Sequence, residues 1–133
     1  MTSSTLEFAA SVVSAVAEVD GDVTIALAPA VIHRSEGISG VDPGTRWSQA
    51  AELVFTGAEL EGEPPALPAH IVRGKLRAGV YTYLDMLPVP THGVGPAAFD
   101  MEFSDGSRLA VVGETVTLRL HGDAKYVEHT NVA

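Results

Sequence analysis

Alternation of apolar and polar residues with a period of two is the feature of this sequence that most restricts its fold. Phe99, Met101 and Phe103 alternate with the acidic residues Asp100 and Glu102. A strand buried on one face shows this period, whereas an amphipathic helix repeats its apolar positions every three to four residues. The same alternation recurs in three further segments: 23–28, 51–56 and 115–121. The sequence therefore predicts a sheet built from half-buried strands.

Turn residues separate several of these segments. Asp20-Gly21 lies between two apolar runs, as does Asp105-Gly106, and this dipeptide suits the positive φ angles of tight hairpins. Gly113-Glu114 lies between two further runs. We therefore expect a three-stranded meander over residues 97–122.

The segment before the first hairpin allows two interpretations. Ser4-Thr5-Leu6-Glu7 fits a helix capping box, and apolar residues follow it at helical spacing. Alternatively, residues 11–19 form a strand, with Val13 and the residues at i+2 steps facing inward. We favour the strand, because Asp20-Gly21 then closes a hairpin onto residues 23–32.

Glycine and proline mark three expected loops. They are 33–46, 59–69 and 87–98. A chain of 133 residues suits one domain with its own core. We predict one all-β domain over residues 1–133, an antiparallel β-sandwich or partly open β-barrel of about eight to ten short strands. The expected core residues are Val13, Ile25, Leu27, Leu53, Phe55, Leu76, Leu84, Phe99, Met101, Phe103, Leu109, Val111, Val116, Leu118 and Leu120.

Composition excludes several classes of function. The chain has no cysteine, which rules out disulfides, cysteine nucleophiles and thiolate metal sites. Its formal net charge of -9 disfavours binding to a phosphate backbone, so we expect no nucleic-acid partner. The longest apolar run, 26–32, is far shorter than the about 20 residues of a membrane helix. Residues 1–5 lack the features of a secretory signal, and we expect a cytoplasmic protein without membrane contact.

The histidines do not form a known metal motif. His121-Gly122-Asp123 has the form of half a facial triad for iron, but the second histidine that this site requires is missing at a suitable spacing. A zinc site assembled from separate loops, for instance by His33 and His92, stays open. We therefore expect no catalytic residues, no metal and no cofactor.

Polar aromatic residues offer a candidate binding site. Tyr81 and Tyr83 share one strand face, and with Trp47 they make up most of the polar aromatic residues. Such side chains at a barrel mouth can stack on sugars or other flat ligands, although core packing explains them equally well. The candidate ligand site comprises Trp47, Tyr81, Tyr83, His33 and His92.

Three basic residues form a stripe. Arg73, Lys75 and Arg77 point to the same side of one expected strand on an otherwise acidic molecule. A docking edge for an acidic partner is one interpretation. We favour the other, in which the stripe pairs with acids on a neighbouring strand, such as Asp100 and Glu102.

The run Gly40-Val41-Asp42-Pro43-Gly44-Thr45-Arg46-Trp47-Ser48-Gln49 resembles a stretch shared by a family of short bacterial proteins of unknown function. Further matches to the same layout are Leu67-Pro68, Gly74 with Leu76, Leu87-Pro88-Val89-Pro90, Phe103 with Asp105-Gly106, and Tyr126-Val127-Glu128. The resemblance covers the chain from about residue 6 and implies no functional residue. Phe8-Ala9-Ala10 with Val12, followed by a hairpin, is faintly similar to small immunity proteins that neutralise bacterial toxins.

These observations lead to three hypotheses of function. The first is a non-catalytic binding module of the bacterial cytoplasm, which takes an unknown protein partner or a small ligand. A homodimer through an open sheet edge is compatible with it. The second is an immunity-type protein that covers a basic toxin with its acidic surface. The third is a small enzyme with a histidine site built from loops.

Overall fold

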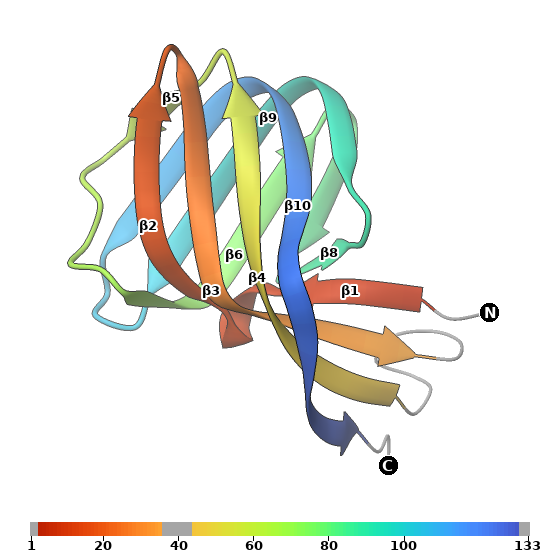
Figure 1. Cartoon of the computed structure of the whole chain (residues 1–133). Coiled ribbons are helices and arrows are strands. Elements are labelled where there is room, and N and C mark those ends of the chain that lie inside the picture. The colour runs from red at the N-terminus through yellow and green to blue at the C-terminus, as the bar shows by residue number, and fades with distance from the viewer. Residues whose placement is uncertain (1–2, 36–43, 131–133) are drawn as a thin grey trace.

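The computed structural model of the chain describes residues 3–35 and 44–130. Within them, ten strands form a single antiparallel sheet, and one short 3-10 helix lies between the first two strands (Figure 1). The strands are β1 (Ser3–Glu7), β2 (Val12–Val19), β3 (Asp22–Ser35), β4 (Gly44–Thr56), β5 (Glu59–Glu61), β6 (Ala69–Ala78), β7 (Tyr81–Leu84), β8 (Met86–Pro88), β9 (His92–Phe103) and β10 (Arg108–Thr130), and the 3-10 helix η1 is Phe8–Ala10. The prediction of an all-β antiparallel fold is confirmed.

The sheet curls into a partly closed ring. Its strands pair in the order β2-β6-β9-β10-β4-β3, and β3 pairs again with β2. The alternating residues of these strands point inward and form one hydrophobic core. Because the sheet folds back on itself, the architecture is a partly open barrel rather than a sandwich of two sheets.

The ring closes unevenly. β4 and β10 pair from Thr56 opposite Thr115 to Gly44 opposite Thr130, whereas β2 and β6 meet through only two residue pairs, Val12–His70 and Val13–Ala69. We call the second junction the seam and the first the wall. The wall is held by a long hydrogen-bond ladder. Because the seam has only two residue pairs, it needs other contacts to close the core.

Phe8 supplies the main contact of this kind. Its ring is fully buried, with its centroid 4.9 Å from that of Phe99. A Cβ at Gly74 would lie 2.7 Å from the Phe8 ring, so only glycine lets β6 approach this side chain so closely. Asp85 reinforces the junction, because its carbonyl accepts the Phe8 N–H and its own N–H donates to the Gly74 carbonyl.

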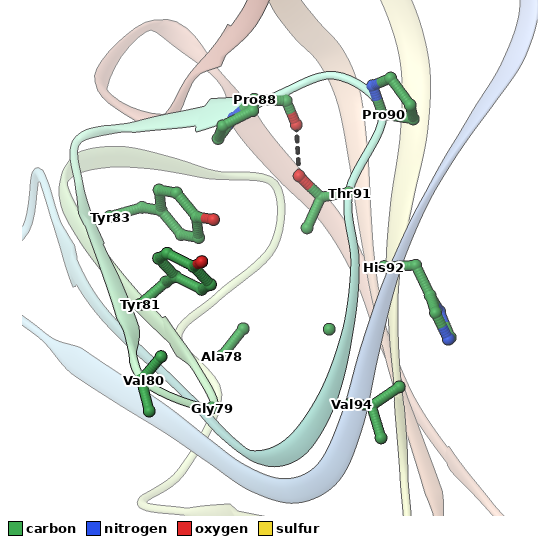
Figure 2. A pocket seen from close by; sticks show the side chains of 11 residues that line it. Ala78, Gly79, Val80, Tyr81, Tyr83, Pro88, Pro90, Thr91, His92 and Val94 are labelled. Carbon is green, nitrogen blue, oxygen red and sulfur yellow. Dashed lines mark hydrogen bonds between the residues drawn. The ribbon is translucent and has the colours of Figure 1, made fainter.

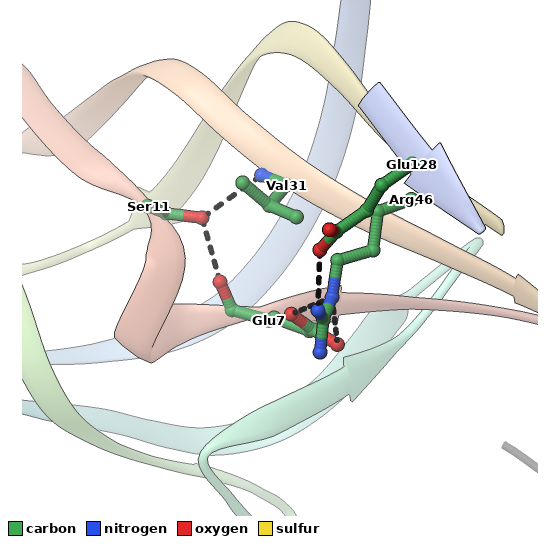
Figure 3. A network of polar contacts seen from close by, with 5 residues as sticks. All are labelled: Glu7, Ser11, Val31, Arg46 and Glu128. Atoms are coloured by element: carbon green, nitrogen blue, oxygen red, sulfur yellow. Dashed lines mark hydrogen bonds and ion pairs between the residues drawn. The ribbon is translucent and has the colours of Figure 1, made fainter. Parts of the chain in front are cut away.

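Ser11 fixes the turn between η1 and β2 (Figure 3). Its buried hydroxyl donates to the Glu7 carbonyl at 2.7 Å and accepts the Val31 N–H at 3.1 Å. One side chain therefore ties η1 to β3 and satisfies a backbone donor that would otherwise lack a partner there.

The ends of β3, β4 and β10 extend beyond the ring and continue the sheet toward β1 (Figure 1). We call this region, residues 3–7, 31–35, 44–48 and 125–130, the extension. Arg46 on β4 bridges the two flanking strands of this extension (Figure 3). Its Nε lies 3.2 Å from a Glu7 oxygen, and its Nη1 lies 2.7 Å from a Glu128 oxygen. The hydrogen bond to Glu128, then the charge of Glu7, raises the pKa of Arg46 despite partial desolvation.

The predicted meander over residues 97–122 is wrong in one respect. Gly113-Glu114 does not end a strand, since β10 continues through it with a shift of register against β9. A Cβ at Gly113 would lie 2.9 Å from the Ala58 Cβ, so the glycine permits close packing within a bulge. The segment therefore contains two long strands.

The strand predicted for residues 11–19 is confirmed as β2, but its expected alternation is interrupted. A register shift between Val13 and Ala15 reverses the face, so Val16 packs against the core and Ala17 is exposed. Such a bulge adds one residue and inverts the pattern beyond it. The expectation that Ala15, Ala17 and Val19 point inward is therefore wrong.

Two of the expected core residues are also misplaced. Leu84 is exposed, because it lies opposite Lys75 on the short edge strand β7. Leu120 is partly exposed, near the shift of register in β10 that precedes Lys125. The other predicted core residues are buried.

The three expected loops are shorter than predicted. β5 occupies residues 59–61, and β9 begins at His92, inside the expected loop 87–98. The expected loop 33–46 loses its ends to β3 and β4, and its central residues 36–43 lie outside the described residues. Backbone pairing with distant strands outweighs the local effect of glycine and proline in these segments.

Candidate functional site

A hollow of about 430 Å³ lies beside the hairpin of β6 and β7 (Figure 2). One side consists of the turn at Ala78–Tyr81 and of Tyr83. The other consists of Pro88 at the end of β8, Pro90 and Thr91 in the connection, and residues 92–94 at the start of β9. The hollow thus lies between the β6–β7 hairpin and the start of β9, whose residues 92–94 pair with residues 115–117 of β10.

Two tyrosines form the floor of the hollow. The rings of Tyr81 and Tyr83 stack with centroids 6.4 Å apart and planes inclined by 20°. Alternation along β7 places both on one face, and Figure 2 shows both rings directed into the loop that residues 88–94 form. Tyr83 packs against the core, whereas Tyr81 is 64% exposed. Because Tyr83 is fixed against the core and stacks on Tyr81, the exposed ring of Tyr81 is suited to stacking on a flat ligand.

The opposite side is shaped by backbone contacts. The Thr91 hydroxyl donates to the Pro88 carbonyl and closes the turn that leads into β9. A Cβ at Gly93 would lie 2.6 Å from the Ala78 Cβ, so glycine allows β9 to pass close to the end of β6. These contacts define the hollow without a hydrogen bond from either tyrosine hydroxyl among the described residues.

The hollow is electrically neutral and has an apolar rim. None of the residues that line it carries a carboxylate, an ammonium or a guanidinium group. Val80 and Val94 stand at its edge and are 93% and 75% exposed. On a chain with a net charge of -9, a neutral aromatic hollow with exposed valines is a distinct surface.

The structure brings together only part of the predicted ligand site. Tyr81 and Tyr83 meet in the hollow, and His92 borders it, but the His92 ring points away and its Nδ1 lies 2.7 Å from the Thr117 hydroxyl oxygen (Figure 2). Trp47 and His33 lie on the extension instead, on β4 and β3. The prediction that all five share one site is wrong, because β4 and β7 lie on different parts of the sheet.

Trp47 belongs to a second aromatic cluster. Its ring meets Tyr126 edge to face at 5.6 Å, and the Arg34 guanidinium carbon lies 4.6 Å from its centroid. Its indole N–H donates to the Thr45 hydroxyl at 2.7 Å. These contacts use its ring and its polar atom to hold the extension together.

The histidines are distributed over the sheet. His33 is buried on β3, whereas His121 Nε2 lies 3.0 Å from a Glu52 oxygen. His70 Nε2 lies 3.0 Å from the Ala9 carbonyl oxygen. Across the two described ranges, no three histidine or acidic side chains are grouped as a metal site.

The basic stripe lies along β6 beside acidic residues of β9. Arg73 is opposite Glu102, with 4.0 Å between their charged groups, and Lys75 is opposite Asp100. Arg108 also contacts Glu102 at 3.5 Å. Arg73 therefore has the cross-strand ion pair that we favoured, whereas Lys75 faces Asp100 only in register and Arg77 lies opposite Ala98. Its alternative role as a docking edge stays a prediction.

The end of the ring opposite the extension carries acidic side chains from three segments. The Ala58 N–H donates to the Gly21 carbonyl, and β5 pairs with residues 110–112, so these segments adjoin. The acidic residues are Glu18, Asp20, Asp22, Glu59, Glu61 and Glu114, and no lysine or arginine occurs in residues 18–24, 55–61 or 110–118. We call this region the acidic end.

Sequence reasoning missed residues 88–91 as part of a site. Pro88, Pro90 and Thr91 were assigned to a loop, and no pattern in the sequence connects them to Tyr81. The prolines were a signal of a rigid turn, but its partner segment is set by the fold.

Comparisons with known protein families, with curated proteins and with solved structures found no match. The resemblance to short bacterial proteins of unknown function therefore stays a prediction. Separately, no helix among residues 3–35 and 44–130 is long and apolar enough to traverse a lipid bilayer.

Proposed function

We propose that this protein is a non-catalytic binding module of the bacterial cytoplasm, and that the hollow beside Tyr81 takes a small neutral ligand with a flat face. The observation that carries the proposal is the stacked tyrosine pair in an uncharged hollow with exposed valines at its rim. A flat apolar ligand face would cover Tyr81 and displace water from both valines.

The lining argues for binding rather than for catalysis. Its polar side chains are two phenols, one imidazole that points away, and one hydroxyl bonded to Pro88. General acid–base catalysis requires a positioned group that exchanges a proton with the substrate, and nucleophilic catalysis requires an activated nucleophile. The hollow offers neither arrangement.

A protein-observed NMR titration tests the proposal with two neutral probes, indole and a methyl glucoside. We expect one of them to bind, to shift the amide signals of residues 80 and 91–94, and to bind at least about tenfold more weakly to Tyr81→Ala. Tyr126→Ala, which removes an exposed tyrosine from the extension, is the matched control and should leave binding unchanged. Failure of both probes, or equal binding to Tyr81→Ala, would contradict the proposal.

The acidic end favours a second candidate, an immunity-type protein that covers a basic toxin surface. Six carboxylates from adjoining segments create a field that attracts a basic partner and accelerates its association. This candidate uses a different part of the molecule from the aromatic hollow, so the two are separable.

Capture experiments with paired variants test this second candidate. The double variant Glu59→Gln, Glu61→Gln should lose a stoichiometric basic partner from bacterial lysate, and salt should weaken the parent complex. Asp100→Asn, Asp123→Asn removes the same charge elsewhere and should retain the partner. The candidate fails if no basic protein is captured, or if both double variants behave alike.

A further inference from the structure

One edge of β2 is unpaired along most of its length. β2 pairs with β3 on one side, but on the other side it meets β6 only at Val12 and Val13. Residues 14–19 therefore face no other strand among the described residues, and Figure 1 shows β2 at the border of the ring. Unpaired strand edges of this kind are templates for pairing with another chain.

The hairpin geometry identifies which backbone groups are available. Asp20 and Gly21 both have positive φ, at 52° and 81°, so they form a two-residue turn flanked by the hydrogen-bonded pair Val19–Asp22. Antiparallel pairs alternate, which makes Glu18–Val23 and Val16–Ile25 the non-hydrogen-bonded pairs. The N–H and C=O groups of Glu18 and Val16 thus point away from β3, toward the open edge.

The outer face of the same segment is apolar. Ala15, Ala17 and Val19 are exposed there, and Val19 is 62% exposed. Residues 62–68 run along this side of the molecule in Figure 1, but they leave all three exposed. Natural edge strands usually carry charges, prolines or inward-pointing lysines that prevent pairing, and on this face β2 has none of them.

We propose that β2 pairs with β2 of a second copy of this chain, antiparallel about a two-fold axis at Ala17. In this register Ala17 faces Ala17 of the second copy, and Ala15 faces Val19, so every exposed apolar residue of the face gains an apolar partner. Glu18 faces Val16, and these two residues exchange the backbone hydrogen bonds of their free groups. No two carboxylates lie directly opposite each other, so the segment is complementary to itself.

The net charge gives the pairing a characteristic salt dependence. Each copy carries a formal charge of -9, so the two copies repel at long range. Added salt screens this repulsion and should strengthen the dimer, whereas it would weaken a complex with a basic partner. Salt therefore distinguishes this interface from docking at the acidic end.

Sedimentation velocity on the full chain tests the proposal. We expect the parent to show a monomer–dimer equilibrium below about 1 mM that shifts toward dimer with salt. Glu18→Pro removes one free N–H without removing a β2–β3 hydrogen bond, and Ala17→Lys places two like charges at the axis. Both should raise the dissociation constant at least about tenfold. Val112→Lys, at an exposed valine of β10, makes the same charge change and should dimerise like the parent.

The absence of cysteine allows a direct test of the register. Residues directly opposite in a non-hydrogen-bonded pair have Cβ atoms about 4.5–5.5 Å apart, close to disulfide geometry. Mild oxidation should therefore cross-link Ala17→Cys into a covalent dimer, and should leave Val112→Cys largely monomeric. Circular dichroism melts establish that each variant is folded. A monomeric parent, or a dimer that survives in folded Ala17→Lys and does not cross-link through Ala17→Cys, would overturn the proposal.

Discussion

The wall and the seam close the same ring by different means. At the wall, β4 and β10 share a long ladder, and their side chains meet across it with few shifts of register. At the seam, β2 and β6 share two residue pairs. The Phe8 ring beside Gly74, the Ile71 N–H that donates to the Ser11 carbonyl, and the hydrogen bonds between Asp85 and Gly74 supply the remaining contacts. The difference teaches that backbone pairing and side-chain contacts substitute for each other in closing a barrel. It also explains why an unpaired edge remains beside the seam.

The largest expected effect comes from the side chain that fills the seam. Phe8→Ala should lower the free energy of unfolding by about 3–5 kcal/mol, because it leaves a cavity among fully buried neighbours. Urea denaturation measures this loss. Phe55→Ala, which truncates a buried ring of the wall, is the matched control of equal size.

The two variants should differ in where the protein opens. In Phe8→Ala, amide exchange at Ile71 should accelerate before global unfolding, since its N–H donates to Ser11 across the seam. In Phe55→Ala, amide exchange at Ile71 should accelerate only as far as the lowered free energy of global unfolding predicts. A loss below about 1 kcal/mol in Phe8→Ala would show that Phe8 does not hold the seam together.

A smaller effect is expected from the buried hydroxyl beside Phe8. Ser11→Ala should cost about 1–3 kcal/mol, because the Val31 N–H loses its partner in a buried position. Thermal denaturation checks the change. Ser14→Ala removes an exposed hydroxyl three residues away and should stay within about 0.5 kcal/mol of the parent. Equal effects of the two variants would show that the Ser11 hydroxyl does not stabilise its contacts with Glu7 and Val31.

The extension depends on ion pairs that are accessible to water. Arg46→Gln removes two of them and should cost about 0.2–1 kcal/mol, since the side chain is partly exposed and solvent screens both pairs. The raised pKa of Arg46 means that the folded protein holds this proton more tightly than the unfolded chain, so the contribution is present at neutral pH and is lost only as pH rises through the folded value. Urea melts of the parent and of Arg46→Gln at neutral pH measure the loss.

Arg119→Gln serves as the control for this variant. Arg119 is exposed on β10 and forms no ion pair with any residue that the structure describes. It should change stability less than Arg46→Gln at neutral pH. A larger loss in Arg119→Gln would contradict the bridging role of Arg46.

The smallest effect is expected at the hairpin that joins β9 to β10 in the ring. Hydrogen bonds from the Ser107 hydroxyl and then from its N–H lower the pKa of Asp105 below 3.8. A lowered pKa contributes stability that is present above the ordinary value and is lost as pH falls through the folded value. Ser107→Ala should therefore raise the pKa of Asp105 toward 3.8, as an NMR titration would show. Ser104→Ala, in the same turn, should leave that pKa unchanged.

Local patterns predicted the wall better than the seam. Alternation identified the buried faces of β3, β4 and β9, and Asp20-Gly21 located the hairpin of β2. The same reasoning misassigned Ala17, Leu84 and the glycine at position 113. A bulge in β2 reverses the face at Ala17, and a short edge strand leaves Leu84 exposed. At Gly113 a bulge lets β10 continue where a turn was predicted.

The candidate site was predictable only in part. Tyr81 and Tyr83 were found because strand alternation is a local property that places i and i+2 together. The contribution of residues 88–91 was not found, since their position opposite Tyr83 depends on β8 pairing with β1 and β9 pairing with β10. Periodicity carries no information on such distant pairing.

The sequence by itself determined the strands, the tight hairpins and the apolar faces of this protein, because these follow from side-chain period and from the backbone freedom of Asp-Gly turns. Tertiary structure alone decided how the sheet closes. Phe8 beside Gly74 and the hollow that Tyr81 and Tyr83 line arise where segments far apart in the chain meet, and the free edge of β2 arises where β6 diverges from it. Contacts between distant segments depend on the packing and strand-pairing free energies of the whole ring. Each local segment contributes only a small part of these energies, so its own sequence does not determine them.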